Sequence, residues 1–243
     1  MPRTLSLIFK VVVVLDRKRA GEVASSTCTR WTGFGMTLYV SEFENMTTNY
    51  DDVSVVRRRV LSEDVGGILA EEIGSFKGCS QSVLVRSRAA RIAVRKLLRE
   101  HGCSEWPLLR RLGIGPCWPP GLIGSLSHCD EYAAAALASS GRYSGIGIDI
   151  EPAQPLAFDI LERVIVPSEK QFALTTPYGG RLLFCAKEAT YKAAYSIDRQ
   201  FLEMHDVEID LSCNKALTRY GQVANLVAHI DLETITVLAL IKA

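Results

Sequence analysis

The chain has 243 residues, and its 28 Lys and Arg nearly balance its 27 Asp and Glu, so the formal net charge at pH 7 is +1. This balance excludes a protein that grips nucleic acid through bulk positive charge, and it excludes an acidic solvating tail. A hydrophobic fraction of 48% excludes disorder over most of the chain. The length suits one large domain or two lobes of about 100 residues each.

The cysteines and the N-terminal residues indicate in which cellular compartment the protein is expected. Seven scattered cysteines, with no C-x-x-C pair, argue against a disulfide framework or a zinc ribbon. Free thiols suit a reducing compartment, so we expect a cytoplasmic protein. The apolar run at residues 5–15 is broken by Lys10 and is shorter than the roughly 20 residues that a membrane helix needs. We therefore expect no membrane span, and interpret the run as a buried strand or part of a loose extension.

Periodicity predicts the elements of the first half. Residues 53–73 and 84–101 are predicted as helices, and a Pro- and Gly-rich loop follows from Gly113 to Ser125. Tyr132–Ala138 is predicted as a strand or a short helix. Ser144–Glu151 alternates isoleucine with glycine and acidic residues, which predicts a strand with one buried face that Pro152 ends.

The second half continues with a loop and a helix within residues 155–174, and then a helix at 180–196. Three antiparallel strands are predicted at Val207–Leu211, Val223–Asp231 and Thr234–Ile241. The fold class is α+β. Neither a G-x-G-x-x-G nor a P-loop appears, so the usual dinucleotide and nucleotide sites are absent.

Two acidic residues on the 144–151 strand are the first candidate site. Asp149 and Glu151 are two residues apart, so their carboxylates project side by side from one face. Such a pair repels unless a cation lies between them, and Mg²⁺ accepts oxygen ligands of this kind. The alternatives are an exposed acidic strand face and salt bridges to arginine.

Basic and polar groups form three further candidates. Glu188 and Lys192 have the i, i+4 spacing of a surface helix pair, but their neighbours are apolar enough to border a cleft. His128 could be a general base, a phosphate contact, a metal ligand or a structural residue. The 84–101 helix carries an arginine stripe that includes Arg88 and Arg91, which could pair with phosphate or form a solvated face.

In this order, the motifs resemble those of the 4′-phosphopantetheinyl transferases, and most closely the siderophore-synthetase branch of the surfactin-synthetase-activating superfamily. The similar segments cover roughly residues 84–210. They are ARIAVRKLL (Ala90–Leu98), GPCWPPGLIGSLSHC (Gly115–Cys129), GIGIDIE (Gly145–Glu151) and LLFCAKEATYKA around Lys187.

The resemblance implies that the phosphopantetheine arm of coenzyme A is moved to a serine of an apo carrier protein, with release of 3′,5′-ADP. The carriers of siderophore, non-ribosomal peptide, polyketide and lipid synthases are the implied partners. Asp149, Glu151 and Glu188 would hold Mg²⁺ on the pyrophosphate, and the general base would be Glu188 or a Mg²⁺-bound water.

The resemblance also implies the contacts to coenzyme A. Lys187 or Lys192 would contact the α-phosphate and the leaving group, and His128 would hydrogen-bond the 3′-phosphate. Ser127 would shape the adenine and phosphate pocket together with the Trp118–Gly121 loop. Ser87 stands where the family usually has the first arginine of its arginine helix, so Arg86 or Arg88 would have to substitute for it.

The implied fold is a pseudo-two-fold arrangement of two similar α/β lobes with the ligand cleft between them. We expect an N-terminal extension at 1–36, an N-terminal lobe at 37–140 and a C-terminal lobe at 141–243. Residues 86–111 carry eight basic against two acidic side chains, whereas 149–169 are acidic, so a charge-segregated cleft is expected. We expect a monomer that binds no nucleic acid.

Two other functions remain open. One is a binding protein that has kept the coenzyme A cleft and lost turnover, although a decayed enzyme should have lost some of Asp149, Glu151, Lys187 and Glu188. The other is a different Mg²⁺-dependent phosphoryl enzyme, such as a nuclease, in which the W-P-P-G and S-H segments would have no role.

Overall fold

A computed structural model describes residues 31–33, 36–38, 47–50, 52–64, 68–111, 115–176 and 178–243. Of the expected N-terminal extension, these ranges include β1 (Trp31–Gly33), which pairs antiparallel with β2 (Met36–Leu38). The apolar run at 5–15 lies outside the described residues. Within the described ranges, no helix is both long enough and apolar enough to span a bilayer.

The N-terminal sheet has four antiparallel strands in the order β3-β4-β8-β7. Their bounds are Thr47–Tyr50 (β3), Val53–Arg59 (β4), Tyr132–Ser139 (β8) and Leu122–His128 (β7). The helix α1 (Gln81–Glu100) packs on this sheet. The buried residues Ala93 and Leu97 of α1 share a core cluster with Leu137 of β8, so the apolar side of the helix predicted at 84–101 faces the sheet.

Two predictions for this half are wrong. The helix predicted at 53–73 is replaced by β4 and by the 3₁₀ helix η1 (Ala70–Phe76). Val53 and Val55 of β4 are buried in a core cluster against the neighbouring strands, and β-branched residues fit a pleated, buried surface. The loop predicted to reach Ser125 ends earlier, because β7 already begins at Leu122. The short strands β5 (Arg110–Arg111) and β6 (Gly115–Pro116) pair before it.

The C-terminal sheet has five antiparallel strands in the order β10-β11-β12-β13-β9. Their bounds are Val207–Asp210 (β10), Lys215–Thr218 (β11), Val223–Ile230 (β12), Thr234–Lys242 (β13) and Tyr143–Pro152 (β9). The sequence does not predict β11. It also predicts one buried face for β9, whereas residues 145–150 are buried on both faces because α4 covers one side and the other joins a core with β8.

The helices of this half are α2 (Phe158–Val164), η2 (Pro167–Glu169), α3 (Lys170–Thr175), α4 (Gly179–Asp198) and η3 (Met204–Asp206). The long helix α4 confirms the helix predicted at 180–196 and lies directly on β9. A Cβ built on Gly147 would lie 1.8 Å from the carbonyl oxygen of Ala189, and one on Gly145 would lie 2.4 Å from that of Ala193. Glycine is therefore required for this close approach of helix and strand.

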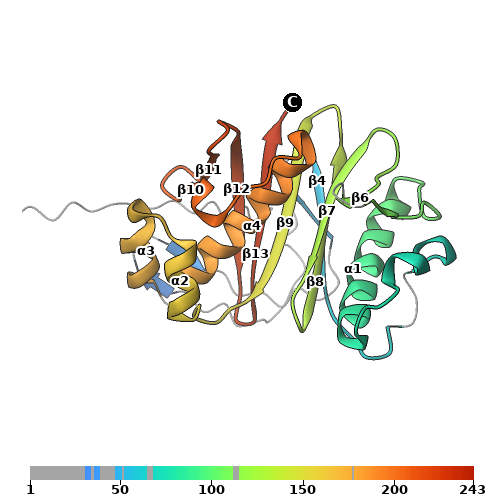
Figure 1. The fold of residues 1–243 in the computed structure, drawn as a ribbon, viewed down its shortest axis with the longest axis horizontal. Coiled ribbons are helices and arrows are strands. Elements are labelled where there is room, and N and C mark those ends of the chain that lie inside the picture. Colours follow the sequence, from blue (N-terminus) through green and yellow to red (C-terminus); the bar gives the residue numbers. More distant parts are fainter. Residues whose placement is uncertain are drawn as a thin grey trace, which may run out of the picture.

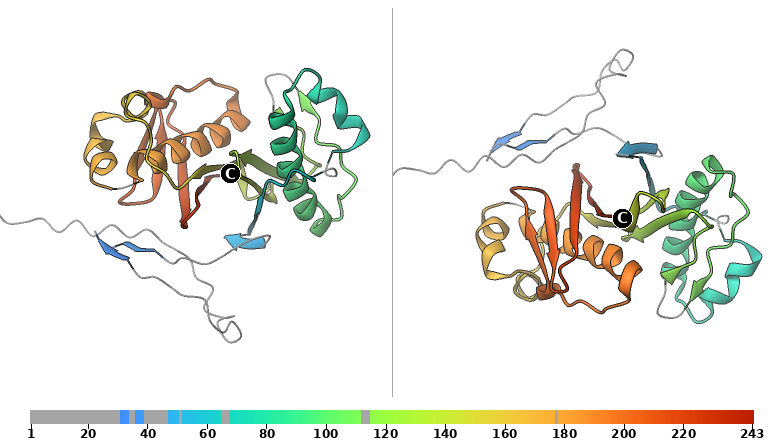
Figure 2. Two further views of the ribbon diagram at one scale, coloured as in Figure 1. Left: turned by 90° about the horizontal axis from the view of Figure 1, so that it is seen from below. Right: turned by 90° about the horizontal axis from the view of Figure 1, so that it is seen from above.

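The two sheets meet at their edge strands β7 and β9, which lie side by side near the middle of the molecule (Figure 1). Each sheet carries one long helix, α1 or α4, and the C-terminus lies between the two groups of elements (Figure 2). The chain crosses from one sheet to the other in the turn between β8 and β9, where the boundary between residues 140 and 141 is predicted. This arrangement is an α+β fold, and the pseudo-two-fold similarity of the lobes stays a prediction.

Candidate functional site

Side chains connect the two edge strands at the seam between the sheets. The hydroxyl oxygen of Ser125 accepts a hydrogen bond from the backbone N–H of Ile148 at 3.0 Å, and the hydroxyl of Ser127 donates to Asp149 at 2.7 Å. Because residues two apart on a strand point to the same side, the S-L-S segment of β7 turns both hydroxyls toward β9. The Nζ of Lys192, from α4, donates to the carbonyl oxygen of Ile148 at 3.1 Å.

Asp149 is the centre of this cluster and is only 4% exposed. Its Oδ1 accepts from the hydroxyl of Ser127 and from Nζ of Lys192, both at 2.7 Å, and Lys192 also donates to Ser127 at 3.0 Å. Within the described residues, no N–H or O–H group donates to the other, buried carboxylate oxygen, Oδ2, although the thiol of Cys185 lies close enough to interact with the Asp149 side chain. A buried polar atom left unpaired costs free energy, so Asp149 has capacity for one more donor or for a cation.

Two further carboxylates lie in the electrostatic field of Asp149. Burial raises the pKa of Glu151, and the negative charge of Asp149 raises it further, while Arg181 at 2.8 Å opposes the shift. Burial also raises the pKa of Glu188, where the positive charge of Lys192 acts against it and that of Asp149 with it. The structure therefore brings Asp149, Glu151, Glu188 and Lys192 into one neighbourhood.

The residues of this neighbourhood fit a hard divalent cation in their chemistry. They offer carboxylate oxygens, the buried Oδ2 of Asp149 has no hydrogen-bond partner among the described residues, and a cation would offset the burial, and secondarily the charge of Asp149, that raise the pKa of Glu151 and Glu188. In the described ranges, however, no three His, Cys, Asp or Glu side chains are grouped closely enough to hold a metal. Glu151 is paired with Arg181 instead.

His128, at the end of β7, adds a group that suits anions. Burial lowers its pKa, and the positive charges of Arg86 and Lys192 lower it further, while Asp149 acts in the opposite direction. The imidazole is therefore neutral at pH 7. The positive charges of Arg86 and Lys192 thus act on the half-buried His128, although Arg86 also pairs with Asp130 and Lys192 with Asp149.

Lys187 does not lie with this cluster. Its side chain is 1% exposed, and Nζ forms an ion pair with Glu169 at 2.8 Å and donates to the carbonyl oxygens of Val164 at 2.8 Å and Met204 at 3.0 Å. Lysine has three donor hydrogens, so these three partners use all of them. Lys187 ties α4 to the neighbouring helices, and it is Lys192 that reaches the seam.

Two arginines of the stripe, Arg91 and Arg95, are used inside the N-terminal lobe. The fully buried Glu72 pairs with Arg91 at 3.4 Å and with Arg95, and Arg91 also donates to the carbonyl oxygen of Leu108 at 3.3 Å. These contacts of Arg91 are thus made within the N-terminal lobe. Arg88 is half-buried, and its Nε has no hydrogen-bond partner in the described part of the chain.

The sequence does not predict the roles of Ser125 and Arg181. A serine two residues before Ser127 on an edge strand is the signal that could have indicated a second bridge to β9. Arg181 lies in the first turn of the helix that carries Glu188, and no motif marks it as the partner of Glu151.

Cys185 is a buried group that could be mistaken for a nucleophile. Burial, followed by the charge of Asp149, raises the pKa of this thiol well above its usual value, so it stays protonated.

Acidic and basic side chains thus converge on a seam between two sheets, as expected for a protein that handles a phosphate-bearing ligand. Comparison with known families agrees. Residues 80–138 match the 4′-phosphopantetheinyl transferase N-terminal domain, and residues 145–236 match the 4′-phosphopantetheinyl transferase superfamily. The two regions together span more than half of the 243 residues. The chain belongs to the 4′-phosphopantetheinyl transferase superfamily.

Individual relatives are similar over shorter stretches. The chain is 45% identical over 97 residues to the 4′-phosphopantetheinyl transferase Npt of Nocardia iowensis, covering 39% of this chain and 44% of the relative. It is 37% identical over 124 residues to PptT of Mycobacterium tuberculosis, covering 49% and 53%. Enterobactin synthase component D of Salmonella typhi is 40% identical over 115 residues, covering 43% and 45%. The chain thus spans about half the length of the curated relatives it matches.

Proposed function

We propose that this protein transfers the 4′-phosphopantetheine arm of coenzyme A to a serine of an apo carrier protein and releases 3′,5′-ADP, in a Mg²⁺-dependent reaction. The observation that carries the proposal is the Asp149–Lys192–Ser127 cluster. Residues from the two matched regions meet in it, with an unpaired carboxylate oxygen beside a lysine. Similarity to enterobactin synthase component D favours carriers of siderophore or other non-ribosomal peptide synthases as substrates, ahead of polyketide and lipid carriers.

In the proposed reaction, the carrier's serine oxygen forms a bond to the phosphorus that bears the pantetheine arm. The bond from that phosphorus to the bridging pyrophosphate oxygen breaks, and 3′,5′-ADP leaves. Glu188 is proposed for one of two roles. Either it takes the serine proton, because burial raises the pKa of its carboxyl and so makes the carboxylate a better proton acceptor, or it joins Asp149 and Glu151 in holding a Mg²⁺ ion that would neutralise charge on the pyrophosphate. The second role requires the three carboxylates to close on the ion, because in the described ranges they are not grouped closely enough to hold it.

The basic side chains would orient coenzyme A. Lys192 is the lysine that we propose to contact the α-phosphate, because Nζ of Lys187 already has three partners. His128 would bind the 3′-phosphate, with Arg86 next to it as the nearer arginine, while Arg88 stays a proposed contact. Ser127 would fix Asp149 and Lys192 in place. We propose that the protein works as a monomer in the cytoplasm, and the six described cysteines, all free thiols, suit that compartment.

The test is to incubate the protein with coenzyme A, Mg²⁺ and apo carrier proteins, and to weigh the carriers by mass spectrometry. We expect a mass gain of one phosphopantetheine arm. Asp149→Ala and Glu188→Ala should abolish the gain, while the control Glu100→Ala, an exposed carboxylate at the end of α1, should retain it. No gain with any carrier refutes the transferase function, and full activity of the Asp149 variant refutes the metal assignment.

A further inference from the structure

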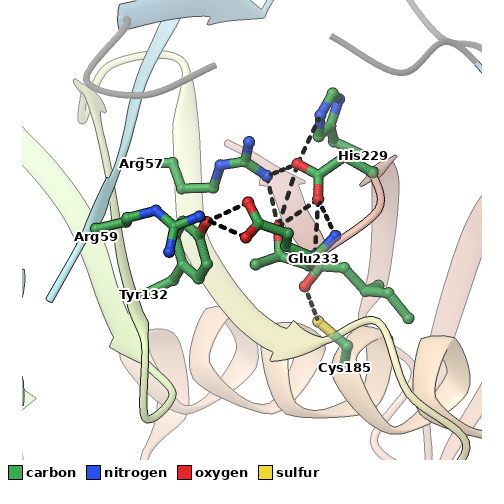
Figure 3. A network of polar contacts seen from close by, with 9 residues as sticks. Arg57, Arg59, Tyr132, Cys185, His229 and Glu233 are labelled. Carbon is green, nitrogen blue, oxygen red and sulfur yellow. Dashed lines mark hydrogen bonds and ion pairs between the residues drawn. The ribbon is translucent and has the colours of Figure 1, made fainter. Parts of the chain in front are cut away.

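A second polar network joins the two sheets outside the seam. Two arginines of β4 and Tyr132 of β8 meet residues of the turn between β12 and β13 (Figure 3). We call this network the clasp, and its members are Arg57, Arg59, Tyr132, His229, Asp231, Glu233 and Thr234. The sequence motifs do not include it, and the proposed chemistry does not use it.

The clasp is built from two ion pairs. Arg57 pairs with Asp231 and donates to the hydroxyl of Thr234 at 2.5 Å. Arg59 pairs with Glu233, which also accepts a hydrogen bond from the phenol of Tyr132 at 2.5 Å. Arg57 and Arg59 are two residues apart, so both point from one face of β4 toward the turn.

The two ion pairs differ in exposure: the inner pair, Arg57–Asp231, is buried, and the outer pair, Arg59–Glu233, is exposed to solvent. The side chains of Arg57 and Asp231 are 11% and 9% exposed, whereas those of Arg59 and Glu233 are 40% and 52% exposed. The Arg59 guanidinium also lies 5.0 Å from the ring centroid of Tyr132, within cation–π range. The Arg57–Asp231 pair is therefore a buried ion pair between the lobes. The Arg59–Glu233 pair is partly solvated, so its two charges can be exchanged by mutation without changing the packing of the core.

Strand register connects the clasp to the candidate site. Arg59 is opposite Tyr132 in the β4–β8 pair, and the next residue of β8, Ala133, is opposite His128 of β7. On the other side, Thr234 begins β13, where the following residue, Ile235, is opposite Glu151 of β9. The clasp thus joins the strand ends that carry His128 and Glu151.

We propose that the clasp residues are positioning residues that set the spacing between the His128 end of β7 and the Glu151 end of β9. The assignment of coenzyme A as the ligand rests on the proposed function, but the proposal that the clasp sets the spacing of the strand ends does not. If the clasp is loosened, the His128 end of β7 and the Glu151 end of β9 can separate. A single ligand then no longer contacts His128 in one lobe and the carboxylates in the other lobe at the same time. A displacement of about 1 Å can cost up to about 100-fold in rate.

The experiment exchanges the charges of the outer pair. Arg59→Glu and Glu233→Arg each place like charges together, and the double variant restores opposite charges. The backbone N–H of Ile148 bonds to Ser125 across the seam, so its hydrogen exchange in the ligand-free protein reports seam opening directly. We expect each single variant to accelerate that exchange and to raise the KM for coenzyme A by about tenfold or more, with a smaller change in kcat.

The matched control is Arg219→Glu. Arg219 pairs with Asp206 at 3.2 Å within the C-terminal lobe, with the two side chains 57% and 21% exposed. The control should leave Ile148 exchange and KM unchanged, and the double exchange should return both part of the way to the wild-type values, because it restores the ion pair but not the hydrogen bond from Tyr132 to Glu233. Ile148 exchange that rises no more than in the control, or a double variant that restores nothing, overturns the proposal. Wild-type protein that binds no coenzyme A would refute the proposed function, while Ile148 exchange still decides the role of the clasp.

Discussion

Lys187 and Lys192 show how five positions along one helix separate two functions. At about 100° per residue, Lys187 and Glu188 point in different directions, whereas Glu188 and Lys192 share a face. Lys192 therefore meets Asp149 at the seam, and Lys187 meets Glu169 inside the lobe. The K-E-A-x-x-K motif alone does not distinguish these two environments, because it does not show which side of the helix faces β9.

This separation predicts a stability effect for Lys187→Met. Glu169 would lose its partner while 3% exposed, and removing one partner of a buried ion pair costs about 3–5 kcal/mol. We expect the free energy of unfolding in urea to fall by that amount. The double variant Lys187→Met/Glu169→Gln should recover part of the loss, since it leaves no buried charge unpaired and keeps an amide oxygen as acceptor for one of the backbone N–H groups that bond to Glu169. A single variant as stable as the wild type would contradict the structural role of Lys187.

At the scale of elements, the contact between α4 and β9 places the site. The two glycines that alternate with isoleucines on β9 let the helix backbone touch the strand, so that side chains at the next positions along the strand meet those of the helix. Asp149 lies two residues after Gly147 on the same strand, so the close helix–strand contact at Gly147 brings Asp149 near Lys192 and Glu188 of α4.

Gly147→Ala tests this contact. The new Cβ would lie 1.8 Å from the carbonyl oxygen of Ala189, so α4 would have to move away from β9. Overpacking of a core typically costs about 1–3 kcal/mol, and we expect loss of stability together with a weaker Lys192–Asp149 bond. The measurement is urea unfolding and the transfer rate. Gly141→Ala is the control, since its nearest contact, the hydroxyl of Ser139, is 3.8 Å away. Equal stability of both variants would rule out a tight helix–strand contact.

At the scale of the molecule, the near-zero net charge is the sum of local pairs. The sequence predicts a basic segment facing an acidic one. In the structure, Arg91 and Arg95 pair with Glu72 within the N-terminal lobe, and Glu169 pairs with Lys187 within the C-terminal lobe. The segments therefore pair largely within their own lobes, and at the seam Lys192 pairs with Asp149 and Arg181 with Glu151.

Charge pairing between the lobes predicts a pH dependence. Burial acts to raise the pKa of Asp231, but a hydrogen bond to His229 and the charge of Arg57 outweigh it and hold the pKa well below its usual range. A depressed carboxyl pKa stabilises the fold above the unfolded-state value of about 3.9, and this stabilisation is lost as the pH falls through the folded-state value.

Asp231→Asn removes this titrating group. We expect the difference in unfolding free energy between the wild type and the variant to be largest near pH 6 and to shrink as the pH falls below about 4. Urea titrations at several pH values measure it. A difference that is independent of pH would mean that Asp231 does not titrate differently in the two states.

The sequence by itself determined the α+β class, the long helices at 84–101 and 180–196, and the residues that carry the family resemblance, because periodicity and short motifs are local. Only the tertiary structure decided that Val53–Arg59 is a strand, since its burial depends on neighbouring strands distant in sequence. It likewise decided which charges meet. Arg91 and Lys187 are held by buried glutamates within their own lobes, Lys192 reaches Asp149 across the helix–strand contact, and Arg57 and Arg59 bind a turn more than 170 residues away. Such pairings depend on which surfaces pack together, and spacing along the chain does not encode them.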